Sequence, residues 1–547
     1  MIGANNGRFR AHALMIRRPC AMMSVMARGP LYLTLTLNNA IVEERTESFF
    51  SSKSQTDLLH LLTVIDAATR SQHLRLMILI IKNPSIGWAQ IEEIHAELDR
   101  FHQAGKHSIA FLQQADNRLY YLACGAEEIY LPPSGGVDLV GLRAEILFFK
   151  NALEYLGIEP ELFSLGQFKS AAEIFNREQM SEASRAMSTS ILADIQEMIT
   201  AKLAAGRKAT PERVQEWIDS GPHTARQAVE RGLVDGLLYE DQLEELATKK
   251  LPRGHACPVK KLAPRDGWFK RLFTFRRPQI AYLVAEGMIV AGESRRSRGS
   301  HPILGAESFV EALRAARDNK RVRAVVLRVN SPGGSALASD LIWRAVKLTG
   351  EKKPVIVSFG NVAASGGYYL AVAGQRIISM PAALTGSIGV IAGKFSVQKL
   401  LGRLGITVDS VETGIRSGYQ SITRPFSEGE EQVIREQMRE FYEDLFLRKV
   451  AEGRSRSVDQ IREVAEGRVW TGRQALGQGL VDEPGGARRA LELARQAARL
   501  EGRKTRLVRL ARKRRWFDLL PFPLFGTSPL DQLQGPLFLM PEDWEIR

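Results

Sequence analysis

The chain has 547 residues, which is too long for one ordinary domain and predicts two to four domains. Hydrophobic residues make up 44% and charged residues 25%, values typical of a soluble globular protein with a sizeable core. They exclude a disordered, collagen-like or coiled-coil chain. The three cysteines (Cys20, Cys124 and Cys257) are too few and too scattered for a disulfide-stapled secreted scaffold or a cysteine-rich zinc module.

The net charge of +14 is concentrated in three segments, 1–28, 249–277 and 501–515. Together these segments hold 23 basic and two acidic residues, so the remainder of the chain is mildly acidic. In 267–273 and 515–520 the basic residues stand beside Trp and Phe, which favours contact with an anionic membrane surface. A solvated linker and tail is the alternative. No nucleic-acid-binding module accompanies the charge, so nucleic acid is not an expected partner.

The apolar stretches near the two ends are interrupted. Arg17, Arg18 and Pro19 break the first, which argues against a transmembrane helix and against a signal peptide. Pro521 and Pro523 break the apolar tail, which therefore cannot form a regular spanning helix. We expect peripheral membrane association, with a cytoplasmic protein as the alternative.

The sequence repeats itself at an offset of 248 residues. Tyr-Tyr-Leu-Ala at 120–123 recurs at 368–371, and Gly-Leu-Val-Asp at 232–235 recurs at 479–482 with a one-residue slip. A constant offset predicts two homologous domains. The expected organisation is a basic N-terminal segment 1–29, a first domain 30–247, a basic aromatic linker 248–277, a second domain 278–499 and a basic and apolar tail 500–547.

Each half has an α/β pattern. In the second half, short β-branched runs at 323–329, 354–359 and 376–380 predict buried strands. A helical pattern covers 335–348, and a further helix is expected from Tyr368. Strands that alternate with helices predict a mostly parallel sheet covered by helices, with functional groups at strand ends and helix N-termini.

Three polar or glycine-rich features occur in the second half alone. Ser365 corresponds to Asn117 in the first half, and Ser387 corresponds to Leu139. The turn Ser331-Pro332-Gly333-Gly334 corresponds to 83–86, which lacks both glycines. At a helix N-terminus Ser365 could act as a nucleophile, and the turn glycines could present N–H groups to an oxyanion. Taken singly, Ser365 could be only a helix cap and the glycines only a tight turn.

A nucleophilic serine needs a base. None of the nine histidines lies beyond His301, so a Ser-His-Asp triad within the second domain is excluded. The alternative is a lysine kept neutral by burial. Lys169 has apolar neighbours in Phe168, Ala171 and Phe175, although a solvated lysine is the simpler interpretation of this residue alone.

These motifs resemble signal peptide peptidase A (protease IV) in its long, duplicated form. The resemblance covers about residues 30–500 and rests on 166–173 in the first half and on 330–334, 364–368 and 385–389 in the second. It implies two tandem domains of the Clp-protease/crotonase fold and a serine endopeptidase that degrades hydrophobic peptides, such as cleaved signal-peptide remnants. It also implies a tetramer on the membrane. The sequence has no Walker A loop, no His-Glu-x-x-His motif and no Rossmann glycine fingerprint, so we expect no metal or other cofactor.

The resemblance also implies roles for individual residues. Ser365 would be the nucleophile and Lys169 the general base, with Ser387 orienting the lysine. Gly366 and Gly334, or less favourably Gly333, would supply the oxyanion-hole N–H groups. Long-form members usually begin with a membrane anchor, which we do not find here. A crotonase-type acyl-CoA enzyme and a degenerate membrane-associated scaffold are the alternative functions.

Overall fold

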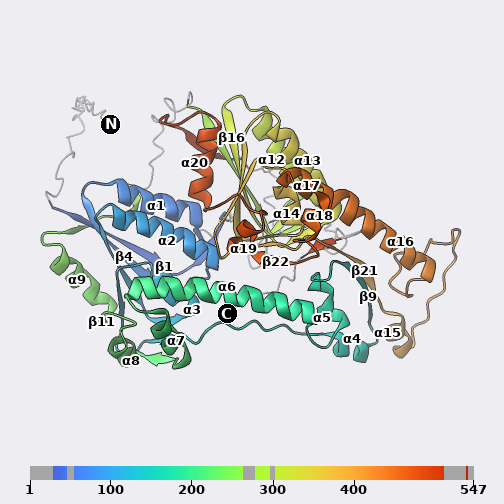
Figure 1. Cartoon of the computed structure of the whole chain (residues 1–547), viewed down its shortest axis with the longest axis horizontal. Coiled ribbons are helices and arrows are strands. Elements are labelled where there is room, and N and C mark those ends of the chain that lie inside the picture. Colours follow the sequence, from blue (N-terminus) through green and yellow to red (C-terminus); the bar gives the residue numbers. More distant parts are fainter. Residues whose placement is uncertain (1–28, 46–54, 263–276, 296–301, 511–536, 540–547) are drawn as a thin grey trace, which may run out of the picture.

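The computed structural model describes residues 29–45, 55–262, 277–295, 302–510 and 537–539. The described residues up to 262 form a first lobe, and those from 277 to 510 form a second lobe that packs against it (Figure 1). The basic segments 1–28, 267–273 and 515–520 lie outside the described residues. Within the described ranges, no helix combines the length and the apolar composition needed to cross a bilayer.

The first lobe is built on a six-stranded parallel sheet. In spatial order its strands are β11 (Gly236–Leu237), β7 (Glu128–Leu131), β5 (His107–Leu112), β4 (Leu74–Ile81), β1 (Leu31–Leu37) and β12 (His255–Ala256). The central strand β4 is almost continuously apolar, as expected of a parallel strand covered on both faces. One face packs against α1 (Leu58–Arg70), α2 (Trp88–Gln103) and α3 (Asn117–Ala123), and the other against α9 (Leu243–Lys250).

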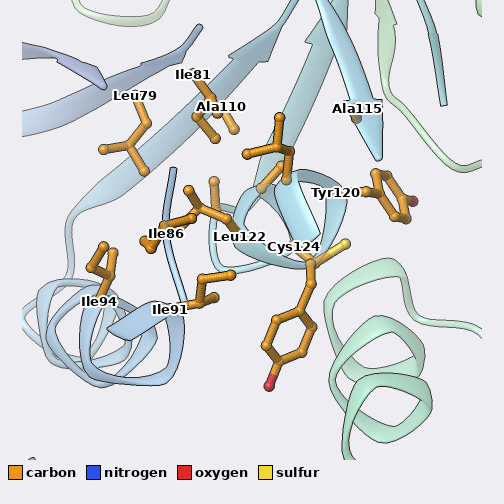
Figure 2. Packing of buried hydrophobic residues seen from close by; sticks show 14 of the residues in the cluster. Leu79, Ile81, Ile86, Ile91, Ile94, Ala110, Ala115, Tyr120, Leu122 and Cys124 are labelled. Carbon is orange, nitrogen blue, oxygen red and sulfur yellow. The ribbon is translucent and has the colours of Figure 1, made fainter. Parts of the chain in front are cut away.

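Figure 2 shows the core between this sheet and its helices. Leu79 and Ile81 of β4 and Ala110 of β5 face Ile91 and Ile94 of α2, and all five are fully buried. Close-packed interiors of this kind deform little. The sheet is therefore a rigid frame for the loops that leave its strand ends.

The second lobe repeats the first. Its strands follow the order β23 (Glu483–Pro484), β19 (Arg376–Ser379), β18 (Val355–Ala364), β16 (Val322–Ser331), β13 (Gln279–Glu286) and β24 (Arg506–Arg509), all parallel. Its helices α12 (Ala306–Asp318), α13 (Ala336–Gly350) and α14 (Gly366–Ala371) cover one face, and α20 (Ala487–Ala497) covers the other. Both the duplication and the mostly parallel α/β fold are confirmed.

Each lobe also carries a second, smaller set of paired strands. In the first lobe β6 (Gln114–Asp116), β8 (Gly136–Asp138) and β10 (His223–Thr224) form a three-stranded sheet. In the second lobe the end of β18 pairs with β20 (Leu384–Gly386), which pairs with β22 (Val469–Thr471). A separate two-stranded pair joins β2 (Ala40–Val42) and β3 (Gln55–Asp57).

A further sheet joins the two lobes. Its order is β15 (Ile303–Gly305), β14 (Met288–Val290), β17 (Gly333–Ser335), β25 (Leu537–Leu539), β21 (Val390–Ser396) and β9 (Glu159–Leu165). Strand β9 belongs to the first lobe and pairs with β21 of the second lobe in antiparallel register, from Leu165 opposite Val390 to Glu159 opposite Ser396. The loop that follows β9 is thereby fixed against the second lobe.

The long helix α6 (Glu182–Arg207) strengthens the junction. It runs from the first lobe beneath the second, with α7 (Pro211–Asp219) and α8 (Ala225–Glu230) following it (Figure 1). Asp194 of α6 accepts hydrogen bonds from Thr471 and Arg473 of the second lobe. Elsewhere in the interface Arg328 of β16 is fully buried and ion-paired with Glu43 and Glu93 of the first lobe.

The remaining helices and turns complete the two lobes. In the first lobe they are α4 (Lys150–Leu156), the 3₁₀ turn Ser170–Ala172, α5 (Glu173–Asn176), the 3₁₀ turn Glu240–Gln242 and α10 (Val259–Leu262). In the second lobe they are α15 (Gln398–Arg403), α16 (Glu428–Arg439), the π-helix Glu440–Leu447, α17 (Arg448–Arg454), α18 (Val458–Arg462) and α19 (Gly472–Gly477).

Local differences from the sequence-based expectations occur at three places. Strand β18 continues to Ala364, through the stretch expected to be a turn, because its last residues pair with β20. The expected turn at Gly333 and Gly334 is instead the short strand β17, which pairs on both sides. Strands β12 and β24 each add an edge to a sheet, so both sheets extend beyond the expected boundaries at 247 and 499.

Candidate active site

Ser365 lies at the junction between β18 and α14. Its backbone has φ 53° and ψ −115°, an unfavourable conformation for a residue with a side chain, and its N–H donates to the Gly386 carbonyl at 2.8 Å. The hydroxyl makes no capping hydrogen bond to α14, so Ser365 is not an ordinary helix cap. A strained turn that holds a serine hydroxyl away from its own helix is typical of a nucleophile.

Lys169 reaches this serine from the other lobe. It follows β9 in the loop before the 3₁₀ turn, and its side chain is only 3% exposed. The Lys169 Nζ lies 2.8 Å from Ser365 Oγ, 2.8 Å from the Ser387 carbonyl oxygen and 2.9 Å from Ser387 Oγ. The structure therefore brings together the three residues singled out in the sequence, although Lys169 and Ser365 are 196 positions apart.

The surroundings of the amine favour its neutral form. Burial lowers the pKa of Lys169 well below its usual value of 10.5. A neutral amine has two N–H donors and one lone pair, which matches the three short contacts: two acceptors on Ser387 and one hydroxyl donor on Ser365. An ammonium would have three donors and could accept no proton. In this arrangement a neutral Lys169 amine could direct its lone pair at the Ser365 hydroxyl.

Backbone N–H groups lie next to the Ser365 hydroxyl. Gly366 is the first residue of α14, so its N–H has no acceptor within the helix. Gly366 also lies against Gly333 and Gly334: a Cβ added to Gly366 would be 3.3 Å from the Gly334 nitrogen and 2.5 Å from Ser339 Oγ. A side chain on Gly334 would overlap the Ile289 backbone. These glycines allow two chain segments to approach closely beside Ser365.

A loop that no sequence motif indicated holds Lys169 in place. The Phe168 N–H donates to the Glu466 carbonyl at 2.8 Å, and the Gln167 N–H donates to the Glu466 carboxylate at 3.3 Å. Tyr442, in the π-helix, donates its hydroxyl to the same carboxylate at 3.0 Å. The neighbouring Gly467 packs so closely that an added Cβ would be 2.5 Å from the Lys169 nitrogen.

The same loop also fixes Ser387. The Arg468 carbonyl accepts the Ser387 N–H at 2.7 Å, and the Arg468 guanidinium lies over the rings of Phe168 and Trp470. Residues 466–468 thus hold both the Lys169 loop and Ser387 in place. Because Gln167 and Glu466 are 299 positions apart, no local pattern in the sequence could have indicated this contact.

Comparisons with known proteins identify peptidases as relatives of this chain. A family model described as peptidase family S49 matches residues 100–251 and 347–501, once in each lobe, and a Clp protease model matches 303–385. A chloroplastic serine protease SPPA of Arabidopsis thaliana is 34% identical over 489 residues, which cover 88% of this chain and 71% of the relative. Protease 4 of Salmonella typhi is 30% identical, covering 82% and 73%, and protease 4 of Haemophilus influenzae is 32% identical, covering 74% and 67%.

Proposed function

The chain belongs to peptidase family S49 and is a serine-type endopeptidase, and we propose that it cuts peptide bonds with Ser365 as nucleophile and Lys169 as general base. The observation that carries this assignment is the 2.8 Å contact between the serine hydroxyl and a buried amine whose pKa is lowered by burial. The Ser–Lys pair is split between the lobes, so each chain has one such site.

The proposed reaction has two halves. In the first, Lys169 takes the Ser365 proton while Oγ attacks the substrate carbonyl, and the Gly366 and Gly334 N–H groups stabilise the oxyanion. Lys169 then returns the proton to the leaving amine. In the second, water attacks the acyl-enzyme with Lys169 again as base, which releases the new carboxyl terminus and restores Ser365. Ser387 orients Lys169 throughout, through two hydrogen bonds.

The proposed substrates are hydrophobic peptides, including the remnants of cleaved signal peptides. Strands β17 and β21 flank the active site, and an extended segment pairs with both of them in antiparallel register. A peptide that adds to strand edges is bound through its backbone. The enzyme would therefore select its substrates mainly by whether they can adopt an extended conformation. Folded proteins would be poor substrates because their strands are already paired.

Covalent labelling tests the nucleophile directly. A serine-reactive acylating inhibitor should leave its adduct on the peptide that contains Ser365, and labelling should disappear in Lys169→Ala. Hydrolysis of a fluorogenic hydrophobic peptide should be lost in parallel. Turnover without labelling at Ser365 would contradict the assignment, and acyl-CoA turnover without peptide hydrolysis would favour a crotonase-type enzyme.

We propose that the enzyme works as a homotetramer. Exposed apolar side chains gather on the outer helices of both lobes, where Tyr155 of α4 is 82% exposed and Leu404, just after α15, is 64% exposed. The two helices are joined by a hydrogen bond from the Leu400 N–H to the Gly157 carbonyl. An apolar surface of this kind is typical of a subunit contact. Light scattering after gel filtration should show four chains, and Tyr155→Glu should reduce that number.

We also propose peripheral binding to anionic membranes through the basic aromatic segments at 267–273 and 515–520, which lie outside the described residues. Cations attract anionic headgroups, and Trp and Phe enter the acyl boundary. The chain should therefore co-sediment with vesicles containing an anionic lipid at low salt and dissociate as salt is raised. Absence of binding at low salt would refute this part of the proposal.

A further inference from the structure

A polar cluster outside the active site joins three helices of the second lobe (Figure 1). Asp340 of α13 accepts a hydrogen bond from the Tyr369 hydroxyl of α14 at 2.7 Å and forms an ion pair with Lys449 of α17. The Lys449 ammonium also donates to the Tyr369 oxygen at 2.8 Å and lies 4.0 Å from the centre of the Trp343 ring. The cluster thus fixes the three helices to one another, and the proposed reaction uses none of its groups.

Two of these helices lead directly to the proposed oxyanion hole. Helix α14 begins at Gly366, immediately after Ser365, and α13 begins immediately after β17, which carries Gly334. Asp340 and Tyr369 both lie near the start of their helices. The hydrogen bond between them therefore fixes the two chain segments that supply the glycine N–H groups.

The two segments are in close contact beside Ser365. A Cβ added to Gly366 would be 3.3 Å from the Gly334 nitrogen and 2.5 Å from Ser339 Oγ. Ser339 directly precedes Asp340 in α13. A movement of α13 relative to α14 would therefore change the spacing of the two N–H donors. Because an oxyanion needs its donors at about 2.7–3.1 Å, even a small displacement would weaken its stabilisation.

The matching acidic residue in the first lobe has a different contact. At the offset of 248 residues, Asp340 corresponds to Glu92 and Tyr369 corresponds to Tyr121, so both lobes keep the tyrosine. The Glu92 carboxylate accepts the N–H of Ala382, a residue of the second lobe, at 2.9 Å. The acid therefore joins the two lobes in the first copy of the fold, and it joins α13 to α14 in the copy that carries the serine.

The helical segment that contains Lys449 also contacts the loop of the proposed base. Lys449 lies just after the π-helix Glu440–Leu447, in which Tyr442 donates to the Glu466 carboxylate. The same carboxylate accepts an N–H from the loop before Lys169. One continuous helical segment thus supports both the base and the N–H donors, and π-helical turns are frequent at functional sites.

We propose that Asp340 is a positioning residue for the oxyanion hole. Bound to Tyr369 and Lys449, it holds α13 and α14 at the spacing that the two glycine N–H groups need. This inference rests on the proposed function. Because the hole binds the oxyanion and not the uncut peptide, loss of Asp340 should weaken binding of the transition state and leave binding of the substrate unchanged. In kinetic terms, kcat falls while KM stays nearly constant.

Kinetics of Asp340→Ala test the proposal. The variant should lower kcat for a fluorogenic peptide about tenfold, since a displaced donor costs less than the roughly 100-fold loss on removal of a whole donor. The inhibition constant of a peptide aldehyde, whose adduct with Ser365 places an oxygen in the hole, should rise by the same factor. The affinity for an uncut fluorescent peptide, measured in the Ser365→Ala background, should not change.

Two conservative variants separate the hydrogen bond from the fold. Tyr369→Phe keeps the fully buried ring and removes only the hydroxyl, so it should reproduce the fall in kcat. Asp340→Asn can still accept the tyrosine hydroxyl through its amide oxygen, so it should recover most of kcat. Glu452→Ala is the matched control, because the Lys347–Glu452 ion pair also joins α13 to α17 but does not involve α14. It should keep the wild-type kcat and inhibition constant.

Two results would overturn the proposal. The first is unchanged kcat and aldehyde inhibition in both Asp340→Ala and Tyr369→Phe. The second is an equal loss of affinity for the uncut peptide, which would indicate a merely structural role. The proposed function stands in both cases if Ser365→Ala is inactive, whereas peptide hydrolysis by Ser365→Ala would refute the proposed function and this inference with it.

Discussion

Replacing Ser387 by alanine tests whether the orientation of the Lys169 amine limits the reaction. The two N–H groups of a neutral amine are accepted by the Ser387 carbonyl and hydroxyl, which leaves the lone pair for Ser365. Ser387→Ala removes one acceptor inside a site where Lys169 is only 3% exposed. A buried donor without an acceptor costs about 1–3 kcal/mol, and the amine can then rotate its N–H toward Ser365.

At about 1.4 kcal/mol per tenfold change in rate, this cost corresponds to a loss in kcat of about 5- to 140-fold. The loss should be measured with a fluorogenic peptide across a pH series, with Tm recorded to confirm that the variant is folded. Ser396→Ala is the matched control, because Ser396 is also buried in the second lobe but its hydroxyl has no hydrogen-bond partner among the described residues. A Ser387→Ala enzyme with wild-type kcat at every pH would refute the reasoning.

Three further predictions follow from the same geometry. Ser365→Ala and Lys169→Ala should each abolish turnover with Tm nearly unchanged. Only the neutral amine accepts a proton, and burial lowers the Lys169 pKa, so kcat/KM of the wild type should already rise with pH well below pH 10.5. A flat or acid-shifted pH profile would contradict the role of Lys169 as base. Glu466→Ala should lower kcat about tenfold and shift the pH profile of kcat/KM. Glu466→Gln can still accept a hydrogen bond and should keep most of the activity. An unchanged pH profile in Glu466→Ala would show that Glu466 does not position Lys169. Burial raises the pKa of Glu92 to about 8, so the folded state binds more protons than the unfolded state between about pH 4.5 and 8, and stability falls as pH rises through that window. In Glu92→Gln the amide oxygen can still accept the Ala382 N–H, but the side chain does not titrate. The free energy of unfolding of the variant minus that of the wild type should therefore be larger at pH 8.5 than at pH 5, by on the order of 3 kcal/mol, as measured by thermal unfolding. A difference that does not depend on pH would contradict the raised pKa of Glu92.

The fold could be predicted well from the sequence because its main determinants are local. Continuous apolar runs such as Leu74–Ile81 are typical of parallel strands buried on both faces, and the repeat at an offset of 248 revealed the second copy of the fold. The short edge strands β12 and β24 were missed, since two to four residues carry little periodicity. The joining sheet was missed as well, because the pairing of β9 with β21 is decided by contacts between the lobes.

No local sequence motif identifies the active-site residues on its own, but comparison of the two halves did single out several of them. Ser365, Ser387 and Gly334 stood out because their counterparts in the first half are different residues. Lys169 was harder to identify, since an isolated lysine beside apolar residues is usually solvated, and its assignment depended on the family resemblance. The contacts of Glu466 and the pairing of β25 join distant parts of the chain, so they could be found in three dimensions alone.

The division of the Ser–Lys pair has a consequence for biosynthesis. Lys169 is translated 196 residues before Ser365, and the two are held together only after β9 pairs with β21. A chain still emerging from the ribosome therefore contains an amine without a hydroxyl to activate, and a fragment of the second lobe would contain a hydroxyl without a base. With the proposed Ser–Lys pair, hydrolytic activity would therefore arise only once the two lobes have docked.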